Sequence, residues 1–314
     1  MFQRVTEKSF YNLLREQDLY FSENRERFSF FAPLSAGECP CESEIMQAID
    51  AFAPWQVAEA WDPCGLQIGY KTRTVHEMTV TLDLNSQLWT EPQISASELI
   101  LAHHPVFFSP VQTLLNEAGE SGNVYQLIRQ NQSFISAHTN LDQAIFGTSF
   151  AILRTLFPEL LPEEIIQSSR VICPDADWPD LGHGRLFTLE TALPLEALHR
   201  SAKEQFQVPD APVRPALAAD LKGLIDWLAI FPGSFDLEMS QKLPETGRGL
   251  IVTGEAKYHE QVALYERRRA LICLGHDVSE RVAMPVLTAY LRLCFPAVAF
   301  AIDRGIDYTL GMAN

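Results

Sequence analysis

The chain has 314 residues, of which 47% are hydrophobic and 20% are charged, a composition typical of a folded globular protein. At about 100–200 residues per domain, this length predicts two domains or one large α/β unit. The formal net charge of −16 argues against a nucleic-acid partner held by phosphate contacts, because such a partner requires a basic surface.

The first residues, MFQRVTEKSFYNLLREQ, lack the continuous apolar core of a signal peptide, and no later run approaches the ~20 apolar residues of a membrane-spanning helix. We therefore expect a cytoplasmic protein without a membrane partner. The six cysteines are scattered, and the spacing of Cys39 and Cys41 suits neither a zinc knuckle nor a C-x-x-C redox pair. In a reducing compartment we expect free, mostly buried thiols.

Residues 1–43 form an N-terminal extension that we expect to be partly helical and to end in the turn-rich segment APLSAGECPC. The stretch SEIMQAIDAFAP then has apolar residues at helical spacing. It predicts an amphipathic helix with Ser43 as its N-cap and with Pro54 as its stop.

Apolar stretches predict strands in two groups, separated by a less regular middle. These strands are expected at residues 78–84, 98–104, 133–138, 227–231, 249–254 and 270–276. Helical patterns lie between several of them, which predicts an α/β fold whose sheets are covered by helices on both faces. We expect an N-terminal half over residues 44–165 and a C-terminal half over residues 166–314, with a boundary that need not be continuous.

Two segments repeat one pattern of an apolar strand, a small residue, a histidine, three residues and an acid. They are FISAHTNLDQA and LICLGHDVSERVA, in which His138 and Asp142 match His276 and Glu280. The match suggests two related α/β halves, and as a single weak pair it leaves duplication and coincidence about equally open.

The double histidine in LILAHHPVFF lies at the predicted end of a strand. Neighbouring strand side chains point to opposite faces, but Pro105 marks the strand end, where His103 and His104 can both turn into one crevice. Each ring would then bind a different metal ion of a two-metal site. The alternative is a pair of hydrogen-bonded structural histidines.

His276 and Glu280 are four residues apart, so they share one face of a helix that begins after Gly275. This spacing is common in metal chelates, and Asp142 and Glu280 would supply the carboxylates that a pair of cations needs. Alternatively, the segment is a solvated helix start with His276 as its cap.

Five motifs together resemble the NIF-three-like dinuclear-metal family, many of whose members are labelled type 2 homologues of GTP cyclohydrolase I. The motifs are EAWDPCGLQIG, LILAHHPVFF, SAHTNLDQA, GLIVTGEAKYHE and GHDVSE, in family order over roughly residues 44–285. The resemblance implies two α/β halves that face each other across a metal-containing cleft, and subunits that assemble into a toroidal homohexamer.

The resemblance also implies the metal ligands, which are the five residues singled out above: His103, His104, Asp142, His276 and Glu280, with Glu280 bridging. His138 fits the family pattern without being a usual direct ligand. For His138 we expect either proton transfer and support of a ligand, or a role in orienting Asp142.

The stretch around Lys257 matches another family motif, at an expected helix start beside the cleft. Lys257 can hold an anionic group there, while the alternative is a structural segment in which Tyr258 packs with its hydroxyl bonded to backbone. Asp62 and Gly65 are interpreted as architectural. The chain departs from the family at Pro63-Cys64, and at FPGSFD (231–236), where the family has a glycine-rich turn; residues 1–43 have no counterpart in the family core.

These features predict a metal-dependent hydrolase with two divalent ions per subunit, chosen from Zn, Fe, Mn, Co and Ni, and a small, anionic substrate. The alternative is an oligomeric metal-binding scaffold, chaperone or regulator without catalysis. The sequence contains no G-x-x-x-x-G-K-[ST] loop, no G-x-G-x-x-G fingerprint and no G-x-S-x-G nucleophile elbow.

Overall fold

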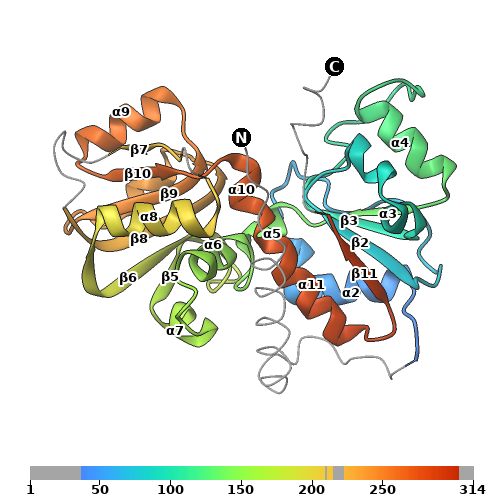
Figure 1. The fold of residues 1–314 in the computed structure, drawn as a ribbon, viewed down its shortest axis with the longest axis horizontal. Helices are drawn as coiled ribbons and strands as arrows, with labels where there is room; N and C mark the ends of the chain where they lie inside the picture. The colour runs from blue at the N-terminus through green and yellow to red at the C-terminus, as the bar shows by residue number, and fades with distance from the viewer. Residues whose placement is uncertain (1–36, 209–210, 215–222, 304–314) are drawn as a thin grey trace. The chain divides into compact units, whose positions relative to one another are not determined.

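The computed structural model describes residues 37–208, 211–214 and 223–303, and their contacts divide the chain into two compact units (Figure 1). The unit called here the first unit contains residues 37–141 and 284–303. The middle unit contains the described residues of 142–283. The predicted 1–43 extension lies largely outside the described residues. The contacts thus divide the chain after residue 141 and again after residue 283. The boundary expected from the sequence was after residue 165, and it was not required to be continuous.

The first unit is built on a five-stranded sheet in the order β1-β4-β3-β2-β11. Its strands are β1 (Gly65–Ile68), β2 (Glu77–Thr81), β3 (Leu99–Ala102), β4 (Ser133–Ser136) and β11 (Ala299–Ile302). Its helices are α2 (Glu42–Phe52), α3 (Pro92–Ala96), α4 (Glu120–Arg129) and α11 (Ala283–Cys294), with short 3-10 turns η1 (Trp55–Val57) and η2 (Ser86–Thr90). β11, β2, β3 and β4 are parallel, and β1 is antiparallel to β4.

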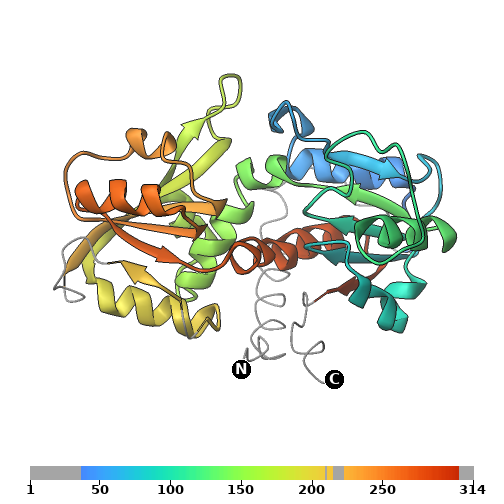
Figure 2. The same ribbon diagram turned by 90° about the horizontal axis from the view of Figure 1, so that it is seen from above.

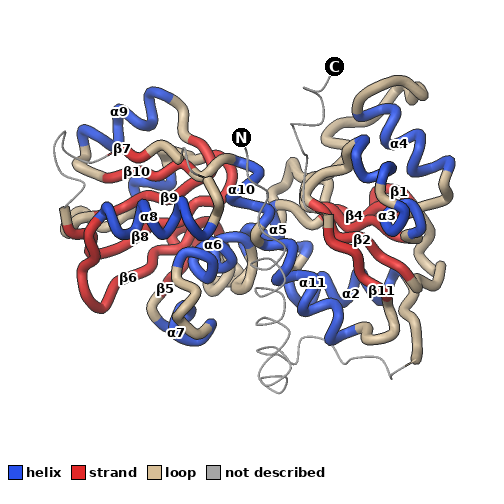
Figure 3. Tube along the Cα trace, in the orientation of Figure 1, coloured by secondary structure: helices blue, strands red, loops and turns tan. Residues whose placement is uncertain are grey.

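Helices cover both faces of this sheet, as Figure 3 shows with α2 and α11 below it and α3 and α4 above it. On the α4 side, Leu127 packs with Ile100, Ala102 and Phe134 of the strands. The four-residue strands β3 and β4 are buried along their whole length, which explains the continuous apolar sequence of β3. In β4 the two terminal serines are buried as well, and both donate hydrogen bonds through Oγ.

The middle unit is built on a six-stranded sheet in the order β5-β6-β8-β9-β10-β7. Its strands are β5 (Ser169–Pro174), β6 (Gly182–Pro194), β7 (Val213–Arg214), β8 (Leu224–Ser234), β9 (Gly249–Glu255) and β10 (Ala270–Cys273). Its helices are α6 (Thr148–Leu156), α7 (Pro162–Gln167), α8 (Leu195–Gln205), α9 (Tyr258–Glu266) and α10 (His276–Arg281), with the 3-10 turn η3 (Met239–Lys242); α5 (Thr139–Gln143) spans the division between the units. Figure 2 shows α8 and α9 on opposite faces of this sheet. The expected α/β class, with two sheets flanked by helices, is confirmed.

Both sheets contain the same arrangement of four adjacent strands. In the first unit, β2, β3 and β4 are adjacent and parallel, and β1 is antiparallel at β4. In the middle unit, β8, β9 and β10 are adjacent and parallel, and β7 is antiparallel at β10. The repeated sequence pattern occupies corresponding places, because His138 follows β4 and His276 follows β10. The correspondence of strand order supports the interpretation of two related halves.

Three local expectations need correction. The predicted helix begins at Glu42 with Cys41 as its N-cap, so Ser43 lies inside it; Glu44 accepts a hydrogen bond from the Cys41 backbone N–H at 2.7 Å and closes this start. All six cysteines are free as expected, but of these only Cys294 is buried.

The third correction concerns FPGSFD, because the strand predicted over residues 227–231 does not end at its first residue. β8 continues to Ser234, and its pairing with β9 shifts register between Phe231 and Ser234. Pro232 has no backbone N–H for the ladder, so a bulge at this point keeps the strand in the sheet.

A buried ion pair fastens α2 to the sheet. Glu42 has no exposed surface, and its carboxylate accepts hydrogen bonds from Arg73 Nε at 3.0 Å, Ser133 Oγ at 2.6 Å and the Tyr70 backbone N–H at 2.7 Å. The loop after β1 is thereby held against the start of β4. None of the helices in the described part of the chain is long and apolar enough to cross a membrane.

Candidate metal site

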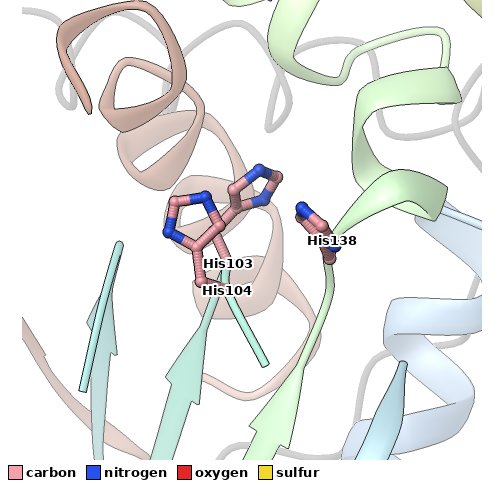
Figure 4. A group of neighbouring side chains, drawn as sticks. All are labelled: His103, His104 and His138. Carbon is pink, nitrogen blue, oxygen red and sulfur yellow. The ribbon is translucent and has the colours of Figure 1, made fainter. Parts of the chain in front are cut away.

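The carboxyl ends of three adjacent parallel strands in the first unit carry polar side chains. β2, β3 and β4 end at Thr81, Ala102 and Ser136, and Asp83, the histidine pair and His138 follow within two residues. Figure 4 shows the three histidine rings at this edge of the sheet. Both His103 and His104 lie just past the strand, so the alternation of strand side chains no longer separates them.

His103 is completely buried. Its Nδ1 lies 2.9 Å from the carbonyl oxygen of Ala137, which can only accept a hydrogen bond. The proton of a neutral His103 ring therefore belongs on Nδ1, and the Nε2 lone pair is the one suited to a metal ion. The backbone carbonyl of His103 also accepts a hydrogen bond from Ser136 Oγ at 3.0 Å, which further fixes its position.

His104 is oriented in the same way by a carboxylate. Its Nδ1 lies 2.7 Å from Asp83 Oδ1, and its backbone N–H donates to the carbonyl of Leu82 at 3.0 Å. Metal-binding histidines usually donate their second ring N–H to a carboxylate or a carbonyl, which fixes the tautomer and strengthens the other nitrogen as a ligand. The centroids of the two adjacent rings are 5.0 Å apart.

His138 joins the pair from β4. Its ring centroid lies 5.0 Å from that of His103 and 5.4 Å from that of His104. Its Nδ1 lies 3.1 Å from Oδ2 of Asp62, whose side chain is fully enclosed. Asp62, interpreted from the sequence as architectural, thus also orients a histidine of the cluster.

The environment keeps Asp62 ionised. Burial raises the pKa of the Asp62 carboxyl, but the contact with His138 and the hydrogen bonds from Cys64 and Thr139 outweigh burial and hold the pKa below its usual range. Burial, followed by the hydrogen bond to Asp62, raises the pKa of the Cys64 thiol to about 12. The cysteine that departs from the family pattern is therefore a neutral hydrogen-bond donor to the carboxylate behind His138, at 2.9 Å.

The three histidines can hold a metal ion. Each offers one nitrogen, and these nitrogens all lie within 4.8 Å of one another. The tautomers of His103 and His104 favoured by Ala137 and Asp83 have the lone pair that a metal requires. Imidazole donors of this kind suit transition metals better than Mg or Ca. The sequence analysis assigned His138 a supporting role, yet its ring stands beside the other two (Figure 4).

The middle unit contains a second group of donors, at the start of α10. The helix begins at His276, directly after Gly275, as the sequence predicted. His276 Nε2 lies 3.2 Å from Oε1 of the buried Glu280, and His276 Nδ1 lies 3.1 Å from Oε1 of Glu255. The hydrogen bond to Glu280, opposed by burial and assisted by Glu255, raises the pKa of His276 to about 9.

The bulge of β8 lies against the side chains of His276 and Glu280. Gly233 has φ +58°, and a Cβ at this position would lie 2.3 Å from Glu280 Oε1 and 3.3 Å from His276 Nε2. Ser279 Oγ accepts the Gly233 backbone N–H at 3.0 Å. The departure at FPGSFD therefore retains a glycine at the point where backbone passes against the two predicted ligands.

Two further predicted residues have clear places in the structure. Asp142 lies in α5, which begins at Thr139, directly after His138. Lys257 is the exposed N-cap of α9, so the expected helix start is confirmed. The packed tyrosine suggested as a structural alternative is not found, because Tyr258 is 82% exposed. The convergence of all five predicted ligands on one pair of ions stays a prediction.

Sequence reasoning missed the residues that orient the histidines. Asp83 and Glu255 were not singled out, although Asp83 is the second residue after β2 and Glu255 is the last residue of β9. An acid at the carboxyl end of a strand next to a histidine-bearing strand was the available signal. The aromatic neighbours Trp61 and Phe108 were also missed, and only spatial proximity reveals them.

Comparison with known proteins places this chain in a family. The model of the Duf34/NIF3 (NGG1p interacting factor 3) family matches residues 42–304. The chain belongs to this family. The match begins at the first residue of α2 and spans both units.

Curated relatives and solved structures agree with this assignment. A "GTP cyclohydrolase 1 type 2 homolog" of Campylobacter jejuni is 25% identical over 250 residues, covering 80% of this chain and 91% of the relative, and one of Nostoc sp. is 29% identical over 233 residues, covering 73% and 82%. The crystal structure of a Bacillus cereus protein related to NIF3 has a TM-score of 0.73 at 16% identity and covers 86% of this chain and 98% of that one. A Staphylococcus aureus hypothetical protein gives a TM-score of 0.72 at 19% identity, covering 85% and 97%. The solved structures support the same fold.

Proposed function

We propose that this protein binds two divalent metal ions per subunit and uses them as a metal-dependent hydrolase. The proposed donors are His103 and His104 of the first unit together with Asp142, His276 and Glu280 of the middle unit. The observation that carries the proposal is the histidine cluster, in which Ala137 and Asp83 engage Nδ1 of two adjacent rings and so favour Nε2 as the metal-binding atom. A purely structural histidine pair gives no reason for a nitrogen of a third imidazole to lie within 4.8 Å of a nitrogen of each of the other two.

The donor set narrows the choice of metal. Three imidazoles and two carboxylates suit Zn, Fe, Mn, Co or Ni, and availability decides among them. The buried Glu280, at 3% exposure, is the carboxylate best placed chemically to bridge, since two cations can repay the cost of keeping its charge out of water.

The side chains around the metal ions would have different roles in hydrolysis. Bound divalent ions would lower the pKa of a coordinated water and polarise the group under attack. Asp83 holds the His104 ring in one tautomer, and Asp62 orients the His138 ring through its contact with Nδ1. His138 is thereby suited to accept a proton from the attacking water and to return it to the leaving group.

For the substrate we propose a chemical class. The curated relatives carry the name GTP cyclohydrolase 1 type 2 homolog, which suggests opening of a purine nucleotide ring by water. The exposed Lys257 at the start of α9 would offer a contact for an anionic group of such a substrate. Assembly of the subunits as a homohexamer is part of the same proposal.

Elemental analysis of the purified 314-residue chain tests the metal centre. We expect about two transition-metal ions per subunit, a sharp loss in His104→Ala, and no change in the control His76→Ala, whose ring lies on the surface in a contact with Glu98. A metal-free wild-type protein that takes up neither zinc nor manganese on dialysis would overturn the proposal.

Activity assays then separate catalysis from storage. The metal-loaded protein is incubated with GTP and with simple phosphoesters, and X-ray absorption reports whether each ion keeps an open coordination position. Turnover that disappears in His104→Ala supports a hydrolase. Two closed sites without turnover support a metal-binding scaffold, chaperone or regulator instead.

A further inference from the structure

Two exposed aromatic rings contact His138 in the first unit. Trp61 is 60% exposed, and its ring centroid lies 5.9 Å from that of His138 at an interplanar angle of 73°. Phe108 is 55% exposed, and its ring centroid lies 6.0 Å from that of His138 at 86°. Both rings therefore border the histidine cluster while more than half of each remains in contact with solvent.

The loop that carries Trp61 is fixed to the histidine strand. The next residue, Asp62, accepts hydrogen bonds through Oδ2 from the Thr139 backbone N–H at 2.9 Å and from Thr139 Oγ1 at 2.5 Å. The same oxygen pairs with His138. The position of Trp61 is therefore coupled to that of His138 through one buried carboxylate.

One amide side chain joins this loop to the loop that carries Phe108. Gln67 of β1 donates through Nε2 to the carbonyl of Pro63 at 3.1 Å and to that of Phe107 at 3.3 Å. Its Oε1 accepts the Val106 backbone N–H at 2.8 Å. Both aromatic residues thus stand on segments that Gln67 ties together, and little conformational freedom remains to be lost when a ligand binds.

Trp61 and Phe108 differ from the isolated apolar side chains that occur on most protein surfaces. Single apolar side chains on a surface are ordinary. Here, however, two aromatic rings contact the same imidazole, and hydrogen-bonded loops hold both of them beside nitrogens that can bind a metal ion. Aromatic rings contribute binding energy through their faces, and they accept flat partners of many kinds.

We propose that Trp61 and Phe108 bind a planar heteroaromatic ring of the substrate and position it over the histidine cluster. This inference rests on the proposed metal-dependent function, which it deepens by assigning the residues that select a flat, unsaturated ring. Both aromatic rings contact His138, so a ring held by them would present its reacting atom to the group that moves the proton.

Binding of guanosine, compared with inorganic triphosphate, tests the ring site without requiring turnover. Titration calorimetry is carried out on zinc-loaded wild type, Trp61→Ala, Phe108→Ala and the control Trp178→Ala, whose side chain is 46% exposed in the middle unit. We expect guanosine affinity to fall roughly tenfold in each of the first two variants, from the usual contribution of aromatic stacking to base binding. Triphosphate binding and the Trp178→Ala protein should be unchanged.

Conservative variants and metal content keep the outcomes distinct. Trp61→Phe should recover part of the guanosine affinity, whereas Trp61→Leu, which keeps apolar bulk without a ring, should not. Equal affinity in all variants, equal losses for guanosine and triphosphate, or no binding of guanosine or adenosine to wild type at millimolar concentration would overturn the ring site. If wild type and all variants fail to take up zinc, and guanosine binding still depends on Trp61, only the metal-dependent function is overturned.

Discussion

Asp83 Oδ1 lies 2.7 Å from Nδ1 of His104, and this contact decides which nitrogen of the ring is offered to a metal ion. Asp83→Ala removes the acceptor that fixes the ring and its tautomer. We expect about 10–100-fold weaker metal binding, the usual effect of losing a carboxylate behind a ligating histidine. Competition against a chromogenic chelator measures the change. Asp83→Asn keeps an acceptor oxygen and should lose less, and Asp177→Ala, an exposed aspartate of the middle unit, should lose nothing.

Proton release should accompany metal binding at His276. Its pKa is raised to about 9 by Glu280, so the metal-free ring carries a proton at pH 7, and a metal ion must displace that proton. Affinity should therefore rise with pH from 7 and level off above about 9. Calorimetry at pH 7.5 in buffers of different ionisation enthalpy counts the protons released. Glu280→Gln removes the largest cause of the raised pKa but also a proposed ligand, so Glu255→Gln provides the milder comparison. An affinity independent of pH between 7 and 9 would contradict this account.

Gly233→Ala should damage both the fold and the metal centre. The positive φ of Gly233 costs an alanine about 1–3 kcal/mol, and its Cβ would lie 2.3 Å from Glu280 Oε1. Urea denaturation should show the loss of stability, and elemental analysis should show a lower metal content. In Gly119→Ala the backbone φ is also positive, at +107°, but no atom lies within 4 Å of the new Cβ. That control should lose stability without losing metal.

The Glu42–Arg73 pair should be important for stability but not for binding. Glu42→Ala leaves the half-buried Arg73 without its carboxylate, and we expect a loss of about 3 kcal/mol in the free energy of unfolding. Urea denaturation of the metal-free protein measures it. Glu77→Ala, on the exposed first residue of β2, is the matched control. A double variant, Glu42→Leu with Arg73→Met, should lose less than the sum of the single changes, because no charge is left unpaired.

The elements that the sequence predicted well are those with a strong local signal. Strand β3 is a continuous apolar run, the short strand β4 has an apolar centre between two serines, and His276 directly follows Gly275, the N-cap of α10. β6 was missed because its polar residues alternate irregularly along 13 positions and its burial changes along its length. The start of helix α2 was predicted two residues late because its N-cap is Cys41, and cysteine has a weak capping preference in sequence.

The histidines of the candidate site could be predicted from the sequence, but the residues that orient them could not. Histidines at strand ends are conspicuous, since a buried strand has little use for an imidazole. Asp62 supports His138 across 76 residues of sequence, and no periodicity encodes such a contact. The same holds for Trp61 and Phe108, which reach one imidazole from separate loops.

The chain passes from the first unit to the middle unit and then returns to the first unit, and this order has a consequence for biosynthesis. Residues 142–283 are contiguous, so a ribosome delivers the complete middle unit before it has delivered α11 and β11. β11 pairs with β2 from more than 200 positions downstream, and until it emerges the edge of β2 stays open to solvent. The histidine-bearing sheet therefore reaches its full width last, after the middle unit has had time to fold. A nascent chain stalled before residue 299 would expose an unpaired strand edge that invites aggregation.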